Sequence, residues 1–338
     1  LARPRAASRR RRGFDDPGHP WTAGLLDLLP WKPDVLHLHN LHGGWFDLRQ
    51  LGPLSRRVPT VVTLHDAWLP LSGPHWPMHV EGWDTEALRA NHALREEAFS
   101  EASLTVVTPS RWMKQVWDAS PWSLKVGDAV VIPNGIDLSI FRVEGKRDLP
   151  GLEAISPEAW RILSISKFGQ EESNSTNTGS FVRLLKELGS QDFFSAWIRL
   201  GRPVNAKSRR IDFGNMTLYK LGFMRDRSQL AALYRAAGVL LHPVDEDNFP
   251  SVVLEAMACG TAVVASRVGG IPEQFADGLH GRFYSAGDEE DRLKVLHSML
   301  QDSDALAWMG QSAAEHARQH FDRRRMAENY LGLYAELQ

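Results

Sequence analysis

The fold prediction starts from the stretch DEDNFPSVVLEAMACGTAVVAS, residues 245–266. Residues 252–259 are apolar except for Glu255, and Gly260 follows them, so this run predicts a buried helix that ends at the glycine. Residues 261–266 form a short, continuous apolar run, which is typical of a parallel strand that is covered on both faces. A helix followed at once by such a strand indicates an α/β protein.

Similar apolar runs recur along the chain, with helical segments between them. Two of these helices are expected to begin after Ser110 and Asp226, because both residues are good N-caps. Two successive series of such units predict two doubly wound, Rossmann-like domains that face a cleft, with ligands at the carboxyl ends of the strands. The expected strands are residues 34–40, 59–66, 103–110, 129–135, 161–169, 194–201, 239–244 and 261–266.

Composition suggests where the domains begin and end. Residues 1–33 are predicted to be a basic arm and irregular lead-in, because the first twelve residues contain six arginines and no acid. The expected domains are an N-terminal domain over residues 34–150, a C-terminal domain over residues 151–320 and a terminal helix over residues 321–338. Since no convincing strand precedes residue 34, we expect the first domain to be incomplete, through truncation or missing segments.

Composition also excludes some classes of function. The 338 residues contain 39 Lys and Arg against 41 Asp and Glu, so the chain lacks the positive charge that nucleic-acid binding requires. Cys259 is the only cysteine, which rules out an internal disulfide and favours a cytoplasmic location. No apolar run is long enough to span a bilayer. Contact of the basic arm with an anionic membrane surface or an acidic partner remains open.

Glu255 is the candidate functional residue within the predicted helix. Burying an unpaired carboxylate costs several kcal/mol, whereas the helix dipole returns at most about 1 kcal/mol, so Glu255 needs a partner or a ligand. Pro250 suits the first helical position and leaves free N–H groups around residues 251–253. These groups predict an anion site, one turn from Glu255.

These residues resemble the retaining nucleotide-sugar glycosyltransferases of family four, which have the two-domain GT-B fold. The family signature is a pair of glutamates with seven residues between them, followed by an Ala-Met-Ala-Cys-Gly run. In this chain the pair falls on Asp247 and Glu255, and the run on residues 256–260. Further similar segments are VVTLHDAW (61–68), TPSRW (108–112), VIPNGID (131–137), LYRAAGVLLHP (233–243) and VGGIPE (268–273).

The resemblance implies a donor site. Asp247 is expected to bind the hydroxyls of the donor sugar, and Glu255 the ribose. His65 would lie at the sugar, so His65 and Asp247 are the expected catalytic residues. The diphosphate would be held by residues of the connecting segment, which are Asn248, Phe249, Pro250 and Ser251. His39, Asn40 and Arg111 are expected on the acceptor side.

Basic residues depart from the family pattern. Lys167 stands where the family usually has an arginine facing the diphosphate, and a second family cation is missing near Thr178. A lysine is a poorer bidentate partner for phosphate than an arginine. Turnover is therefore expected to be slow or absent unless another residue compensates.

The implied activity is transfer of a sugar, with retention, from a nucleoside-diphosphate sugar to the hydroxyl of a glycan, a lipid-linked or a small-molecule acceptor. A leaving-group phosphate oxygen would take the acceptor proton, and no metal or other cofactor is expected. Glycan or glycoconjugate biosynthesis is the expected context. Two alternatives are a non-catalytic paralogue that binds a nucleotide or sugar, which the missing cation favours, and a GT-B sugar-nucleotide epimerase.

Two metal-binding interpretations are less favoured. Residues 245–247 read as Asp-X-Asp, a manganese signature of another glycosyltransferase fold, but they precede a phosphate-binding helix here. His37 and His39, with His42 just beyond, have the chemistry of zinc ligands. They lack a cysteine or an acid at ligand spacing, so we expect no metal site.

Overall fold

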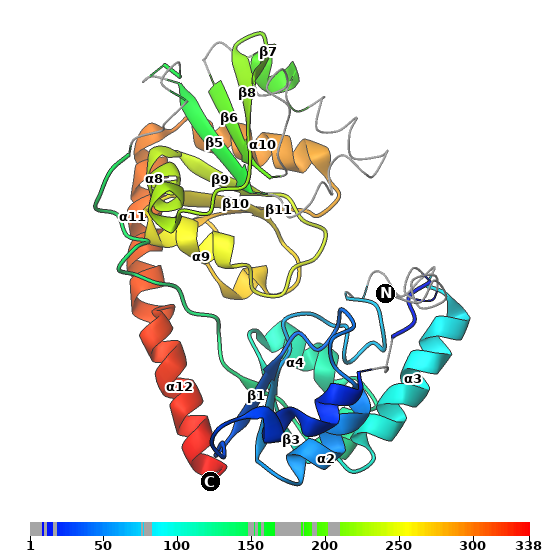
Figure 1. Ribbon diagram of the computed structural model, residues 1–338. Helices are drawn as coiled ribbons and strands as arrows, with labels where there is room; N and C mark the ends of the chain where they lie inside the picture. Colours follow the sequence, from blue (N-terminus) through cyan, green and yellow to red (C-terminus); the bar gives the residue numbers. More distant parts are fainter. Residues whose placement is uncertain are drawn as a thin grey trace. The chain divides into compact units, whose positions relative to one another are not determined.

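The computed structural model shows a chain that contacts divide into two units. One comprises Leu1–Asn134, Glu246–Phe249 and Met326–Gln338, and the other Gly135–Asp245 and Pro250–Arg325. Figure 1 labels their elements. The residues that the structure describes are 9, 12–15, 19–75, 77, 83–147, 152, 155–156, 159–165, 184, 186–190, 195–201 and 210–338.

The first unit contains a parallel sheet in the order β1-β2-β3-β4. Its strands are β1 (Leu36–His39), β2 (Thr60–Thr63), β3 (Leu104–Thr108) and β4 (Val130–Val131). Leu36 pairs with Thr60, and Thr60 with Leu104, so the carboxyl ends of β1, β2 and β3 lie at one edge. The other elements of this unit are η1 (Pro20–Leu28), η2 (Leu48–Gln50), α2 (Leu51–Ser55), α3 (Thr85–Phe99), α4 (Arg111–Asp118) and α5 (Ser123–Val126).

Both faces of this sheet are covered, which explains why its strands are apolar at consecutive positions. Val62 packs into a core with Phe99, Met113 and other side chains from α2, α3 and α4. Its neighbour Val61 is in the opposite cluster, where Tyr330 and other side chains of α12 (Arg323–Glu336) pack. Alternate side chains of a strand point to opposite faces, so each strand needs apolar residues throughout.

The second unit contains a sheet in the order β11-β10-β9-β5-β6-β8-β7, parallel except for the antiparallel β7–β8 pair. Side chains of α10 and α11, such as Leu300 and Leu306, pack in one core with Ile162 and Val264 of the strands. The elements are β5 (Trp160–Ile165), β6 (Ser195–Leu200), β7 (Arg210–Phe213), β8 (Met216–Leu221), α8 (Arg227–Ala236), β9 (Val239–His242), α9 (Ser251–Ala258), β10 (Ala262–Ser266), η5 (Ile271–Glu273), β11 (Gly281–Tyr284), α10 (Glu289–Leu300) and α11 (Ser303–His320).

The α/β fold with two Rossmann-like domains is confirmed, whereas the cleft between them stays a prediction. The predicted N-caps are confirmed, because Ser110 Oγ accepts a hydrogen bond from the Met113 N–H and Asp226 Oδ1 accepts one from the Ser228 N–H. Pro250 is the N-cap of α9 rather than its first residue, since its ψ of 123° is extended. Sequence reasoning missed β7, β8 and β11.

The two units and the predicted domains differ in two places. Residues 135–147, which were assigned to the first domain, group by contacts with the second unit, and most of α12 groups with the first. Among the described residues ahead of β1, the structure has η1 and no strand. The domain boundaries themselves stay predictions.

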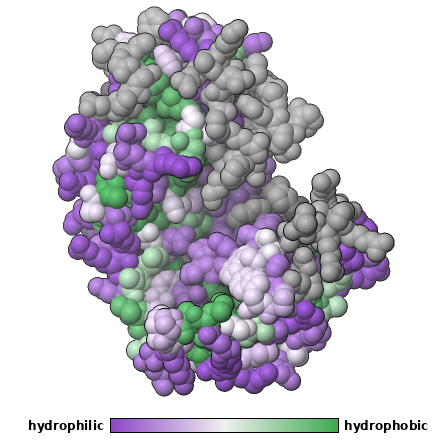
Figure 2. Space-filling view, viewed as in Figure 1, coloured by the Kyte–Doolittle hydropathy of each residue, from purple (hydrophilic) through white to green (hydrophobic). Residues whose placement is uncertain are grey.

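The surface gives no sign of a membrane-spanning segment within the described part of the chain. None of its helices combines the length and the apolar character that crossing a bilayer requires. Among the coloured residues on the face in Figure 2, hydrophilic side chains predominate, with smaller hydrophobic areas between them. The cytoplasmic location stays a prediction.

Candidate functional site

Two predicted site residues, His39 and His65, lie against each other at the carboxyl edge of the first sheet. His39 ends β1, and His65 follows β2, its neighbour in the sheet. His39 Nδ1 is 2.9 Å from His65 Nε2, and the rings stack with centroids 5.2 Å apart. Burial lowers the pKa of His39, so its imidazole favours the neutral form. The structure therefore joins a predicted catalytic residue to a predicted acceptor-side residue.

His37 extends this row of imidazoles along β1. Its Nε2 is 2.7 Å from Thr63 Oγ1 and its Nδ1 is 2.6 Å from the hydroxyl of Tyr334. Burial, and secondarily the nearby His39 and His65, lower the pKa of His37 to about 4. His37 is thus neutral near pH 7 and fixed from both sides, so it orders the edge on which His39 and His65 lie.

The acidic loop after β9 is held to the same edge by Asn248, which is 2% exposed. Its Nδ2 donates to the backbone oxygens of Leu64 and His65, at 3.1 and 3.2 Å. Its Oδ1 accepts a hydrogen bond of 2.6 Å from Ser110 Oγ. Asp247, whose carboxylate accepts from the Asn248 N–H at 2.8 Å, is therefore held beside the segment that carries His65.

The residues that follow Asn248 are fixed through their backbone. The oxygen of Phe249 accepts a hydrogen bond from Asn134 Nδ2 at 3.1 Å, and the oxygen of Pro250 accepts one from Gln274 Nε2 at 3.0 Å. Phe249 and Pro250 are buried, whereas Ser251, the first residue of α9, is exposed. Hydrogen bonds to the backbone therefore hold the two residues that precede the helix.

Glu255 lies one turn into α9 and its side chain is 12% exposed. The hydroxyl of Tyr234 donates to Glu255 Oε2 at 3.1 Å, and Arg227 Nη2 is 3.8 Å from Oε1. Burial raises the pKa of Glu255, and the contacts with Tyr234 and Arg227 oppose that rise. The carboxylate therefore has the partner that its burial requires. One oxygen contacts the phenol and the other lies near a guanidinium.

Other predicted residues are placed but not brought together. Asn40 is exposed, with φ at 48°, and its backbone oxygen accepts a hydrogen bond from Trp45 Nε1. Arg111 is exposed at the first position of α4. Lys167 and Thr178 lie outside the described residues. The roles assigned to all the site residues stay predictions.

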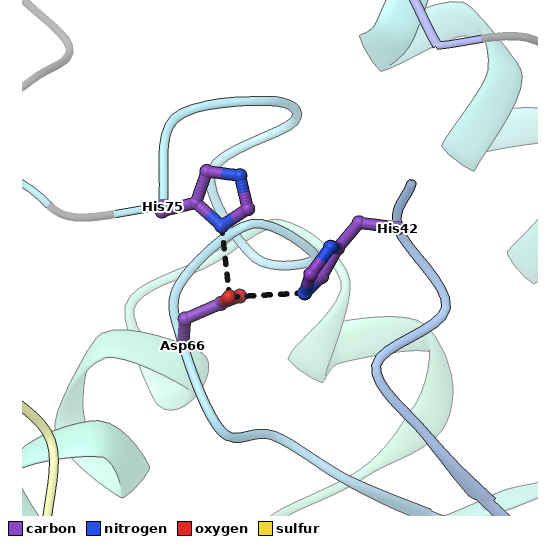
Figure 3. A group of neighbouring side chains, drawn as sticks. All are labelled: His42, Asp66 and His75. Carbon is purple, nitrogen blue, oxygen red and sulfur yellow. Dashed lines mark hydrogen bonds and ion pairs between the residues drawn. The ribbon is translucent and has the colours of Figure 1, made fainter. Parts of the chain in front are cut away.

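One group of metal-ligating side chains stands out among the described residues. His42, Asp66 and His75 each offer a ligand atom, and these atoms lie within 4.8 Å of one another (Figure 3). The sequence offered no acid at ligand spacing from His37, His39 or His42. In the structure Asp66 contacts His42, the third of these histidines. No spacing in the sequence pointed to this group.

Sequence reasoning also missed Tyr234, which contacts Glu255, and Tyr330, which packs against His37. Tyr234 lies in a segment similar to the family and in the apolar stripe of a predicted helix with Leu230, Leu233 and Ala237, and neither feature predicts a role in the site. Tyr330 donates or accepts a hydrogen bond with Thr63 Oγ1 at 3.0 Å, but it comes from the terminal helix. The apolar stripe of that helix was its only signal.

Two family models match the chain, and curated proteins are similar to most of its length. Residues 2–140 match Glycosyltransferase Family 4, and residues 216–316 match Glycosyl transferases group 1. The D-inositol 3-phosphate glycosyltransferase 2 of Catenulispora acidiphila is 26% identical over 302 residues, which are 85% of this chain and 67% of the relative. The chain thus spans about two thirds of that relative's length.

Solved structures show the same fold. Sucrose-phosphate synthase from Thermosynechococcus elongatus superposes with a TM-score of 0.69 at 18% identity, covering 90% of this chain and 73% of that protein. Anabaena Alr3699/HepE, solved in complex with UDP-glucose, superposes with a TM-score of 0.63 at 18% identity, covering 90% and 79%. These likenesses establish the GT-B fold. The two family matches, with the similar curated glycosyltransferases, show that the chain belongs to the group 1 glycosyltransferases of family four.

Proposed function

We propose that this protein transfers a sugar from a nucleoside-diphosphate sugar to an acceptor hydroxyl, with retention of configuration, in glycan or glycoconjugate biosynthesis. The observation that carries the proposal is the buried carboxylate of Glu255 on α9. Replacing such a buried ionic group by apolar residues is often neutral or stabilising, so fold stability gives little reason to keep one. The carboxylate accepts hydrogen bonds, which suits the ribose hydroxyls of a donor.

The start of α9 supports a diphosphate site beside Glu255. Helices α3, α4, α8, α10 and α11 all begin with an Asp or Ser side chain that accepts from their first amides. The N-cap of α9 is Pro250, which makes no side-chain cap. The amides of Ser251 and Val252 would instead bind phosphate oxygens, which the positive end of the helix dipole also favours.

The reaction in this proposal needs positioned charge rather than a protein nucleophile. His65 and Asp247 would bind the donor sugar, and a phosphate oxygen of the leaving group would take the acceptor proton. The amides of Ser251 and Val252, with Lys167, would balance the diphosphate charge without a metal ion. Such preorganised groups act by orientation and by stabilising charge in the transition state.

The relatives suggest which substrates to try first. Alr3699/HepE was solved with UDP-glucose, so UDP-glucose is the first donor. The name of the Catenulispora relative suggests inositol 3-phosphate as the first acceptor to test, followed by glycans and lipid-linked sugars. His39, Asn40 and Arg111 are the proposed acceptor-side residues.

The test measures release of nucleoside diphosphate from a panel of nucleotide sugars, with and without acceptor. Glu255→Gln keeps the shape but removes the charge, and a hydrogen bond to a charged group contributes about 1.5–3 kcal/mol. We therefore expect kcat/KM to fall about 10- to 100-fold. Glu290→Gln, at an exposed position of α10, is the matched control and should leave the rate unchanged.

Three outcomes would contradict the proposal. Equal rates for Glu255→Gln and the wild type would remove Glu255 from the donor site. Calorimetric binding of a nucleoside diphosphate without product from any acceptor would favour a binding paralogue. An epimerised free sugar nucleotide would identify an epimerase instead.

A further inference from the structure

A second group of ionisable side chains lies at the carboxyl edge of the first sheet, and the proposed transfer reaction does not use it. His42 follows β1, Asp66 follows β2, and His75 lies further along the segment that follows β2. Figure 3 shows both imidazoles directed at the carboxylate between them. We propose that His42, Asp66 and His75 bind a divalent first-row transition-metal ion, of which Zn²⁺ fits best.

The distances between the three ligand atoms are close to those around a tetrahedral ion. Asp66 Oδ2 is 3.2 Å from His42 Nε2 and 2.8 Å from His75 Nδ1. With zinc bonds of about 2.0–2.2 Å, two ligands of a tetrahedral site lie about 3.3 Å apart. The histidine nitrogens lie within 4.8 Å of each other. Binding an ion would require these two nitrogens to take that same spacing.

The segments that carry the ligands are held by other contacts. Asp66 Oδ1 accepts a hydrogen bond from the Trp68 N–H at 3.0 Å, which leaves Oδ2 for the ion. The Ala67 N–H donates to the backbone oxygen of His75 at 2.7 Å, so the two ligands on the segment after β2 are held near each other. The His42 ring packs edge-on against Trp68, with centroids 5.7 Å apart. The site is therefore largely formed before an ion binds.

The chemistry of the ligands also suits zinc. Although burial would raise the pKa of Asp66, its contacts with His42 and His75 hold that pKa well below the usual range, so the carboxylate is ionised. Two imidazoles and one carboxylate are a common set for Zn²⁺ sites that keep a position open for water. The exposure of the side chains, 31% for His42 and 43% for His75, leaves space for that position.

Binding the ion changes the proton arrangement in a defined way. The nitrogens that face Asp66 now donate to its carboxylate, so each carries a proton. Coordination needs the lone pair on the same atoms, and each ring must therefore present its other tautomer or release a proton. The ion would join the segment after β1 to the segment after β2. Because Asp66 directly follows His65, the ion would also fix the segment that carries the proposed catalytic histidine.

The experiment titrates Zn²⁺ into chelator-treated, tag-free protein by calorimetry and repeats the titration with Co²⁺ by visible absorption. We expect saturable binding of one ion per chain and the strong visible bands of a tetrahedral cobalt site. His75→Gln and His42→Gln should each weaken binding more than about 100-fold, since even residues behind the ligands change metal affinity 10- to 100-fold. His92→Gln, an exposed histidine of the same unit, should bind like the wild type.

His39→Gln separates this site from the adjacent His39–His65 pair, and it too should bind normally. Loss of binding in His39→Gln equal to that in His75→Gln would overturn the assignment. So would absent saturable binding in the wild type, or unchanged binding in His75→Gln. Circular dichroism checks the fold of each variant, and the cobalt spectrum of the wild type tests the site without any substitution. None of these readouts depends on sugar transfer.

Discussion

Replacing Asn248 by alanine tests the contact that holds the acidic loop to the first sheet. The Asn248 side chain is buried and makes three hydrogen bonds, to two backbone oxygens and to Ser110 Oγ. Alanine removes all three and leaves their partners without that amide. Asp247, which directly precedes Asn248, should then lose its fixed position beside the segment that carries His65.

The size of the effect follows from the number of bonds. Each is worth about 1 kcal/mol net, so Asn248→Ala should lower the free energy of unfolding by about 3 kcal/mol. With a urea m-value of about 2 kcal/mol/M, the unfolding midpoint falls by about 1.5 M. Ser110→Ala should cost about 2 kcal/mol, because Ser110 also caps α4. The shared bond is counted in both variants, so the double variant should lose about 1 kcal/mol less than the sum.

Tryptophan fluorescence during urea unfolding is the suitable assay. Nine of the twelve tryptophans precede Asn134, so the signal reports mainly on the unit that contains Asn248. Asn329→Ala, at an exposed position of α12, is the matched control and should change stability by no more than about 0.5 kcal/mol. A loss below about 1 kcal/mol for Asn248→Ala, or strict additivity with Ser110→Ala, would refute the reasoning.

Three further predictions concern substitutions at single positions. Tyr234→Phe removes the hydrogen bond to Glu255 and should lower the free energy of unfolding, measured in urea, by about 1–2 kcal/mol. The loss should be larger at pH 8 than at pH 4, where Glu255 is protonated. An equal loss at both pH values would contradict this. A Cβ at Gly310 would meet a backbone oxygen at 2.2 Å, whereas one at Gly332 meets nothing within 4 Å, so Gly310→Ala should lower the thermal midpoint and Gly332→Ala should not. The lowered pKa of His37 means that the unfolded state binds more protons between pH 6.5 and about 4, so stability should fall as the pH falls through that window. Allowing for the partial exposure of His37, its contribution to this fall in the free energy of unfolding is about 1–2 kcal/mol, which should be absent in His37→Gln. An equal fall in the wild type and in His37→Gln would contradict the assignment.

Several of the strands that sequence reasoning found are buried on both faces. Val61 and Val62 face opposite cores, and the same holds for Val106 and Val107, so continuous apolar runs mark these strands. The missed hairpin of β7 and β8 is different, because it mixes charged and apolar residues. Its one local signal is the Gly-Asn pair at residues 214–215, which is typical of a tight turn. β7 lies at the edge of its sheet and alternates exposed with half-buried residues, so no continuous apolar run marks it.

The sequence indicated which residues lie at strand ends, but not which of them touch. That His39 and His65 share one edge can be inferred from their positions, since neighbouring parallel strands end at the same edge of a sheet. The bond from Asn248 to the Leu64 oxygen joins residues 184 positions apart, and no local pattern encodes it. Tyr234, the partner of Glu255, was similarly hidden, because its place in an apolar stripe predicts burial and says nothing of where the hydroxyl points.

The group of His42, Asp66 and His75 shows why searching for ligand spacing fails in this kind of fold. Spacing rules describe ligands that share one helix or one tight loop, where separation along the chain fixes separation in space. In a parallel sheet, separation depends instead on strand order. Because β1 and β2 are neighbours, the loops that follow them meet, although a helix-containing segment connects the strands. Reading the residues after each pair of adjacent strands would have found His42 beside Asp66, once the strand order was assumed.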